Sequence, residues 1–278
     1  MSLEGLWNLL NDGRIISTDG YQSFCRMHNV TYTKRDFLFR PGSWRGSLVV
    51  PPVRTLLLGN KLVIGHSDFT LEHRHLRLLR LLNHRIRIFA TNCISSNEMS
   101  VQLPLGVTNY SFESDLHPIL GNQDIILEAF SSANHLEEYD GSVFVAMTAS
   151  TNIAKRSDLL EALRSCSDAK IFEPDYSLNG RRQFLQALAE HSLVPCPEGN
   201  GPDTHRLWEA LYMGGTPVIL TSPFLSNFAR LLPIIQIGDW YQLLDRDLMT
   251  ALWQAAQMKR NNLDWLDINF WNQHILNG

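Results

Sequence analysis

The sequence predicts an α/β fold of two lobes, each built on a parallel sheet. Short apolar runs of about 4–8 residues alternate with stretches of helical periodicity along most of the chain. This alternation is typical of strand–helix–strand units, in which a helix joins two parallel strands. The chain has 278 residues, which allows one large domain or two small ones, because domains usually hold about 100–200 residues.

The second half of the chain shows the alternation most clearly. Its predicted strands are Gly141–Ala149, Ala169–Phe172, Leu193–Cys196, Thr216–Leu220 and Pro233–Ile237. Its predicted helices, which gather apolar residues on one face, are Ser157–Ser165, Gly180–His191, Thr204–Met213 and Asp245–Met258. The order of these elements predicts a parallel sheet that is covered by helices.

The first half repeats the pattern more loosely. Its predicted strands are Arg14–Ser17, Lys61–Gly65, Arg85–Ala90 and Val101–Leu105, and its predicted helix is Leu71–Leu82. Residues Phe37–Pro52 carry three prolines and two glycines, which predicts a long loop.

A linker is expected at Gly121–Asp140, which is acidic and weakly patterned. We therefore divide the chain into residues 1–125 and residues 126–278. Near its end, the segment Leu263–Leu276 predicts a helix with a broad apolar surface and no later strand to pack against. Such a surface needs cover, so we expect this helix to cross back to the first lobe.

Composition excludes several classes of protein. The formal net charge is -4, which disfavours a generally basic nucleic-acid binder. No apolar run approaches the ~18 residues of a membrane span, and the first residues lack the basic and apolar regions of a signal peptide. The four cysteines form no CxxC pair, so we expect free thiols in a cytoplasmic protein; they are Cys25, Cys93, Cys166 and Cys196.

The stretch VPCPEGNGPDTHRLWEALYMGGTPVIL, residues 194–220, combines a strand, a glycine-bearing loop, a helix and a second strand. Gly199 and Gly201 allow the backbone to bend sharply and a ligand to approach closely. Asp203 or Thr204 suits the N-cap of the helix. The free N–H groups of the first helical turn then face the loop, which predicts an anion site.

Three polar residues project from one face of that helix: His205, Arg206 and Glu209. The guanidinium of Arg206 suits phosphate, and the carboxylate of Glu209, one turn further on, suits ribose hydroxyls. The spacing favours a nucleoside diphosphate site. The alternative is a surface ion pair between Arg206 and Glu209, which is worth only ~0.2–0.5 kcal/mol.

The segment PEGNGPDTHRLWEALYMGGTPVI resembles the donor-site signature of exostosin-like glycosyltransferases and their bacterial relatives. Fourteen positions between Pro197 and Val218 match the pattern cP.G.G.DthR.wEal..G.iPV. A weaker similarity in VIGHSDFTL and RIFATNC…VQLPLGVTNY extends the resemblance to about residues 60–240. Residues 1–60 match no pattern of that family.

The resemblance implies the GT-B fold, in which a nucleotide-sugar donor lies between two Rossmann-like lobes. It implies transfer of a sugar from a nucleoside-diphosphate sugar to a hydroxyl of a glycan acceptor. Neither a metal nor another cofactor is implied, because positive side chains and a helix N-terminus stabilise the leaving diphosphate. The residues expected to bind the donor are Gly199, Asn200, Gly201, Asp203, Thr204, His205, Arg206 and Glu209.

A general base is expected in the first lobe, where the acceptor would enter. Asp68 and His66 follow a predicted strand, at the end where α/β sheets place ligands. The alternative role for Asp68 is to cap the following helix, and Asp19 is the next candidate base. The Asp245–Asp247 segment has the DxD form of a metal motif, but its position favours a helix cap.

Two other functions stay open at this level. A protein of the same fold could bind a nucleotide sugar, or act as a scaffold, without catalysis, and the short first lobe favours this alternative. A sugar-nucleotide epimerase is the second. Donor hydrolysis distinguishes an enzyme from a silent binder, and conversion of the donor without an acceptor would indicate the epimerase.

Overall fold

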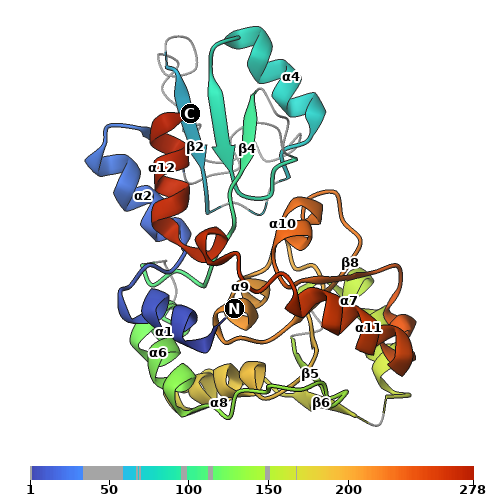
Figure 1. Ribbon diagram of the computed structural model, residues 1–278. Coiled ribbons are helices and arrows are strands. Elements are labelled where there is room, and N and C mark those ends of the chain that lie inside the picture. The colour runs from blue at the N-terminus through green and yellow to red at the C-terminus, as the bar shows by residue number, and fades with distance from the viewer. Residues whose placement is uncertain are drawn as a thin grey trace.

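The chain has a mixed α/β architecture in the computed structural model, which describes residues 2–33, 59–66, 68, 70–94, 99–111, 115–147, 151–166 and 168–278. Every strand pair in its sheets is parallel. This confirms the α/β class expected from the sequence. Figure 1 shows one sheet in the upper half of the molecule and the remaining strands in the lower half.

The upper sheet has four strands in the order β1-β2-β3-β4. Its strands are β1 (Thr31–Thr33), β2 (Lys61–Ile64), β3 (Arg87–Ala90) and β4 (Ser100–Gln102). Helix α4 (His73–Leu82) packs on one face, because Leu62, Ile64 and Ile88 share a core cluster with Leu76 and Leu79 of that helix. Val63 and Phe89 point the opposite way, as strand alternation requires, into the main core.

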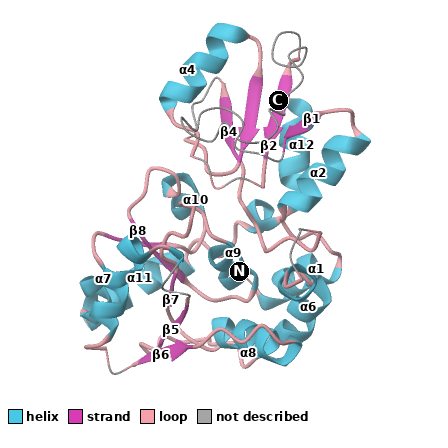
Figure 2. Ribbon diagram, turned by 180° about the vertical axis from the view of Figure 1, so that it is seen from behind, coloured by secondary structure: helices cyan, strands magenta, loops and turns pink. Residues whose placement is uncertain are grey.

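The lower strands form one sheet in effect. They are β5 (Val143–Ala146), β6 (Ala169–Phe172), β7 (Val194–Pro195), β8 (Pro217–Leu220) and β9 (Ile235–Ile237). A parallel bridge between Val143 and Leu193 joins β5 to β7, so the strand order is β6-β5-β7-β8-β9. Figure 2 shows these strands running through the lower half of the molecule.

Helices cover both faces of this lower sheet. Leucines of α7 and tryptophan and methionine of α11 pack with Val143, Val145 and Val218. On the other face, α8 and α9 pack with Phe144, Ala146 and the main core. These helices, with a shorter one and a 3₁₀ turn, are α7 (Ile153–Leu163), α8 (Leu178–Ala189), α9 (His205–Tyr212), α10 (Ser226–Leu231), η2 (Trp240–Leu244) and α11 (Arg246–Gln257).

Most of the first half of the expected linker at 121–140 is helical, although the sequence there is weakly patterned. Helix α6 (Gln123–Ser132) is capped by the side chain of Asn122 and buries Ile125, Ile126 and Phe130. It packs against α8 and against an N-terminal helix that the sequence pattern did not reveal. That N-terminal helix is α1 (Leu3–Asn11). The sequence pattern also missed α2 (Thr18–Met27), α5 (His117–Leu120) and α10.

The C-terminal segment contacts the first half of the chain, as expected. It is two pieces, η3 (Leu263–Leu266) and α12 (Ile268–Asn277), separated where the side chain of Asp267 caps the second. Helix α12 packs against α2 (Figure 1), and Lys61 Nζ donates a hydrogen bond to the carbonyl of Leu276.

The expected strand at 14–17 is wrong. Ile15 forms only an isolated antiparallel bridge with Asp267, and Ser17 instead caps α2 by accepting from the Gly20 amide. The expected loop at 37–52 lies outside the described residues.

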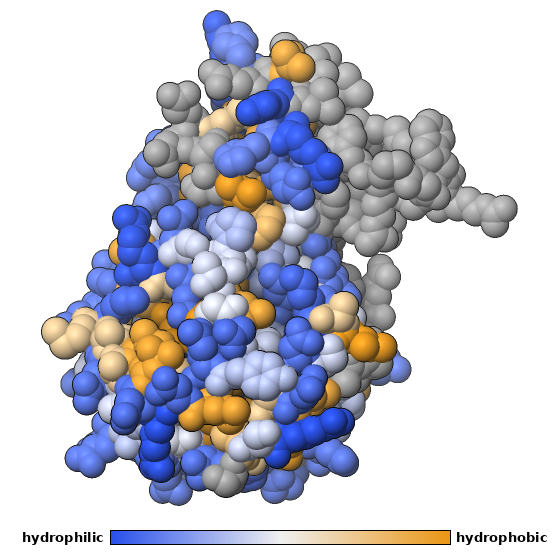
Figure 3. Space-filling view, turned by 90° about the vertical axis from the view of Figure 1, so that its right-hand side faces the viewer, coloured by the Kyte–Doolittle hydropathy of each residue, from blue (hydrophilic) through white to orange (hydrophobic). Residues whose placement is uncertain are grey.

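The described surface mixes hydrophilic and apolar side chains. Figure 3, which views the molecule from one side, shows apolar side chains scattered among hydrophilic ones in its lower half. None of the helices in the described ranges has the length and apolar character needed to cross a bilayer. Cys25, Cys93 and Cys196 are buried free thiols and Cys166 is a half-buried one, as expected from their spacing.

Candidate functional site

A cavity of ≈ 320 Å³ lies where the loops of the upper sheet meet α7, α8 and α9. Asp68 lines it from the first half of the chain. All eight residues predicted to bind the donor also line it: Gly199, Asn200, Gly201, Asp203, Thr204, His205, Arg206 and Glu209. The structure therefore brings the sequence motif and one of the two candidate bases to a single site.

The glycine-bearing loop before α9 is fixed by side chains from other segments. Asn152, the N-cap residue of α7, donates from Nδ2 to the carbonyl of Gly199 over 2.7 Å. A Cβ atom on Gly201 would lie 2.8 Å from Asn92 Nδ2, a distance that real side chains do not tolerate. A side chain at position 201 would therefore have to displace the side chain of Asn92, which accepts a hydrogen bond from the Asp203 amide.

The N-terminus of α9 is open. Thr204 is its N-cap residue, but no side chain accepts a capping hydrogen bond there. The hydroxyl of Thr204 is buried and has no hydrogen-bond partner among the described residues. The first-turn N–H groups and this hydroxyl face a cavity that Thr204 lines, an arrangement that favours an anion.

Two arginines meet beside this helix end. Arg206 lies in the first turn of α9, and its buried Nε has no hydrogen-bond partner within the described ranges. Arg156 reaches in from α7 and donates from Nε to the Glu198 carbonyl over 3.3 Å. Burial lowers the pKa of both guanidiniums, and the charge of Arg206 lowers the pKa of Arg156 further. A bound anion would relieve that repulsion.

Glu209 is buried and paired with an arginine that sequence reasoning missed. Its Oε1 accepts from Arg181 Nη2 at 2.7 Å and from the Thr108 hydroxyl at 3.2 Å. Burial acts to raise the pKa of Glu209, but the charge and hydrogen bond of Arg181 outweigh it and lower the pKa overall. The alternative of a surface pair with Arg206 is therefore wrong.

The second oxygen of the Glu209 carboxylate remains available. Oε2 accepts no hydrogen bond from the described part of the chain, while Glu209 lines the cavity. Arg181 holds the carboxylate in place through the other oxygen. The site thus presents one oriented, ionised acceptor to a ligand hydroxyl.

Asp203 has a structural position at the edge of the cavity. Its Oδ1 accepts from Trp208 Nε1 at 2.8 Å, and its Oδ2 accepts from the Leu105 amide at 2.9 Å. Burial raises the pKa of Asp203 to about 7 in spite of these donors. Both carboxylate oxygens join α9 to the loop after β4, so Asp203 shapes the site through the protein's own bonds.

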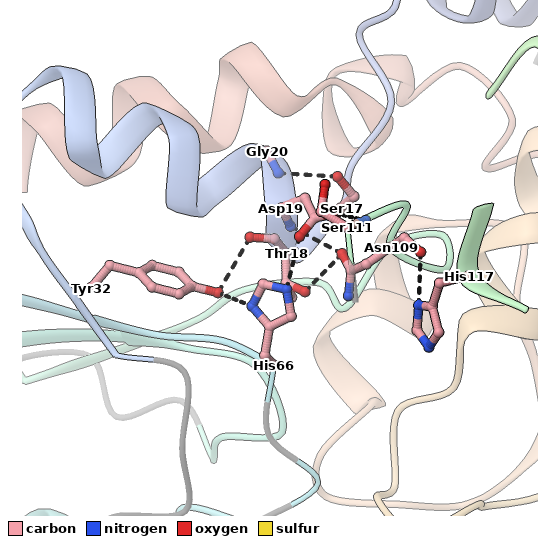
Figure 4. A network of polar contacts seen from close by, with 9 residues as sticks. All are labelled: Ser17, Thr18, Asp19, Gly20, Tyr32, His66, Asn109, Ser111 and His117. Atoms are coloured by element: carbon pink, nitrogen blue, oxygen red, sulfur yellow. Dashed lines mark hydrogen bonds and ion pairs between the residues drawn. The ribbon is translucent and has the colours of Figure 1, made fainter. Parts of the chain in front are cut away.

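The two candidate bases lie in different environments. Asp68 lines the cavity, whereas His66 is absent from its lining and its side chain is only 1% exposed. His66 Nδ1 lies 2.6 Å from the Tyr32 hydroxyl, and Nε2 lies 3.0 Å from Asp19 Oδ1 (Figure 4). Asp19 Oδ2 accepts from the Ser111 amide. Through these contacts, His66 and Asp19 join the segments that carry Tyr32 and Ser111.

Sequence reasoning missed Arg156 and Arg181, although a signal for both was present. Arg181 falls on the face of α8 that buries Leu185 and Leu188, and Arg156 on the face of α7 that buries Leu159. A charged residue on the apolar face of an amphipathic helix needs a partner or a ligand. Both arginines could have been singled out on that basis.

No protein-family model matches this chain, and no curated protein sequence matches it. Within the described ranges, no group of three or more His, Cys, Asp or Glu residues is arranged to hold a metal ion.

Proposed function

We propose that this protein is an exostosin-like glycosyltransferase of the GT-B fold. It would move a sugar from a nucleoside-diphosphate sugar to a hydroxyl of a glycan acceptor without a resident metal. The observation that carries the proposal is the pairing, in one cavity, of an arginine without an ion-pair partner in the described chain and an oriented carboxylate one turn later. These are Arg206 and Glu209. The parallel sheet on each side of the cavity supports the two-lobe arrangement.

The diphosphate would lie at the N-terminus of α9. Arg206, Arg156 and the first-turn N–H groups supply positive charge there. Glu209 Oε2 would accept from the ribose hydroxyls. The wall formed by Phe172, Tyr176 and Phe184 offers the apolar surface that a nucleobase needs. Each part of a nucleotide thus has a matching part of the cavity.

The acceptor would approach from the side of Asp68, which comes from the first half of the chain. As the bond between sugar and phosphate breaks, negative charge grows on the leaving diphosphate. Fixed positive groups in a buried site stabilise that charge without reorganisation. The carboxylate of Asp68 would stabilise the group that takes up the acceptor's proton, and the His66 network would fix the loop that carries Asp68.

The test is Arg206→Ala, with binding measured for nucleoside diphosphates and for the matching nucleosides. We expect roughly ten- to hundredfold weaker diphosphate binding, because a charge-assisted hydrogen bond is worth ~1.5–3 kcal/mol. Nucleoside binding should change much less. Arg182→Ala is the matched control, since the side chain of Arg182 is 38% exposed, pairs with Glu128 and does not line the cavity. Equal losses for both ligands would refute the assignment of Arg206.

A second candidate is a nucleotide-sugar-binding protein without catalysis. The observation that favours it is the absence of His66 from the cavity lining, which leaves fewer bases on the acceptor side. Slow hydrolysis of the donor by the wild type, lost in a site variant, would exclude this candidate. Conversion of the donor sugar without acceptor would instead indicate an epimerase.

A further inference from the structure

The imidazole of His205 is oriented by the backbone of a distant segment. His205 Nδ1 lies 2.8 Å from the carbonyl oxygen of Gly106. A carbonyl oxygen only accepts hydrogen bonds, so Nδ1 carries a proton. In the neutral ring, Nε2 then has its lone pair free, and it has no hydrogen-bond partner among the described residues. His205 lines the cavity.

The orienting carbonyl is itself held rigidly. Gly106 has a positive φ of 76°, and a Cβ atom there would lie 2.1 Å from the Ile16 carbonyl oxygen. The Leu105 amide is bound by Asp203, and the Val107 amide donates to the same Ile16 carbonyl over 2.9 Å. The hydrogen bonds of the residues before and after Gly106 therefore fix the direction of its carbonyl.

The surroundings of His205 favour the neutral ring before reaction. Burial lowers the pKa of His205, and the charge of His117 acts in the same direction. The hydrogen bond to Gly106 and the charges of Glu209 and Asp68 act oppositely. Two carboxylates thus lie where they would stabilise an imidazolium once a proton arrives.

We propose that His205 Nε2 is the proton acceptor of the transfer reaction, an inference that rests on the proposed function. The acceptor hydroxyl gives its proton to Nε2, and its oxygen forms a bond to the anomeric carbon of the donor sugar. The bond from that carbon to the diphosphate oxygen breaks, and the electron pair leaves with the diphosphate beside Arg206. The products are a glycoside, a nucleoside diphosphate and an imidazolium, which returns its proton to water.

This assignment separates the roles of the groups around the acceptor. A general base needs a lone pair that another group holds in the right direction. For His205, the Gly106 carbonyl is that group. Asp68 then acts beside His205 by stabilising the imidazolium. Its charge raises the pKa of His205, so removal of that charge should lower the pKa of His205.

The experiment compares His205→Gln with His117→Gln in the full chain. His117 is a matched control, because its Nδ1 also lies 2.9 Å from a backbone carbonyl, that of Asn109, while it does not line the cavity. We expect the kcat of His205→Gln to be about 10²- to 10⁴-fold lower than that of the wild type. Its donor binding should stay within about threefold of the wild type, and His117→Gln should keep most activity.

The pH profile of kcat is the second measurement. In the wild type, kcat should rise as His205 loses its proton, with a midpoint below the ordinary value of about 6.5. His205→Gln should lose this acidic limb. Asp68→Asn should keep the limb but move its midpoint lower, since Asp68 raises the pKa of His205. The reverse result, with the limb lost only in Asp68→Asn, would make Asp68 the base and overturn the proposal.

A third measurement does not depend on turnover. Nitrogen-15 NMR of labelled histidine reports the tautomer, and the proposal requires the proton on Nδ1 of His205. A proton on Nε2 would overturn it even in an active enzyme. Full activity and an unchanged acidic limb in His205→Gln would also refute the role of His205, while leaving the proposed function standing. A wild-type protein that binds no nucleoside diphosphate would refute the proposed function, and this inference with it.

Discussion

The buried ion pair between Arg181 and Glu209 gives the sharpest test of how the site is held together. Both side chains are only 4% exposed, and the two atoms in contact lie 2.7 Å apart. Arg181 Nη2 also donates to the Leu120 carbonyl over 2.7 Å. The perturbation is Arg181→Met, which keeps a long apolar side chain and removes the charge and the hydrogen bonds.

The variant should be strongly destabilised. Removing one partner of a buried pair leaves an uncompensated charge and typically costs ~3–5 kcal/mol. That cost is a large fraction of the ~5–15 kcal/mol by which native domains are stable. Adding Glu209→Gln should recover part of the loss, because the double variant no longer buries an unpaired carboxylate.

The neighbouring Arg182 provides a matched control. It forms an ion pair of the same kind with Glu128 at 2.6 Å, but the two side chains are 38% and 58% exposed. Exposed pairs are worth only ~0–1 kcal/mol, so Arg182→Met should change the free energy of unfolding little. The two substitutions remove the same group from adjacent positions of one helix and differ mainly in burial.

The assay is urea unfolding at several pH values. Arg181 helps to lower the pKa of Glu209 in the folded protein, so this pair contributes stability above the unfolded pKa of about 4.3. That contribution is lost as pH falls through the folded pKa, and it should be missing in Arg181→Met. Equal unfolding free energies for Arg181→Met and Arg182→Met would refute the reasoning.

Two further predictions concern the frame of the site. Gly106→Ala should lower the free energy of unfolding by more than the ~1–2 kcal/mol of a strained backbone, because its Cβ would also meet the Ile16 carbonyl. Gly13→Ala is the control, since Gly13 has a positive φ but open space around it, so that only the backbone strain is added. The urea unfolding midpoints of the two variants make the comparison. Asp203 has its pKa raised by burial to about 7, so its stability contribution should fall as pH rises from about 4 through 7. Asp203→Asn should flatten that decline, and a stability difference between the wild type and Asp203→Asn that does not change over this range would contradict it.

The sequence predicted those parts of the fold that local patterns determine. The strand predicted at 169–172 matches β6 residue for residue, and the helix predicted at 204–213 differs from α9 by one residue at each end. Short apolar runs bounded by turn residues carry their own signal. The C-terminal helix also met the expected neighbour, because its apolar surface exceeded what nearby elements could cover.

Other features depend on contacts that no local pattern encodes. Glu209 pairs with Arg181, which is 28 positions away on another helix, so the surface-pair alternative could not be rejected from spacing. Helix α6 lies in an acidic stretch with a modest apolar face and is stabilised by packing on α8. In both cases tertiary contacts decide the structure, while the helical periodicity around them is ordinary.

The cavity owes its shape to bonds that cross from the first half of the chain to the N-terminus of α9. The Asp203 amide donates to Asn92 Oδ1 over 3.0 Å, and its carboxylate accepts from Leu105. His205 donates to Gly106 in the same region. The two bonds of Asp203 are buried and the bond of His205 is partly buried; leaving a buried group unsatisfied costs ~1–3 kcal/mol. Ligand binding cannot easily separate α9 from the loop at 105–106. Adjustment to a ligand should therefore come from the opposite wall, where Tyr176 is 44% exposed.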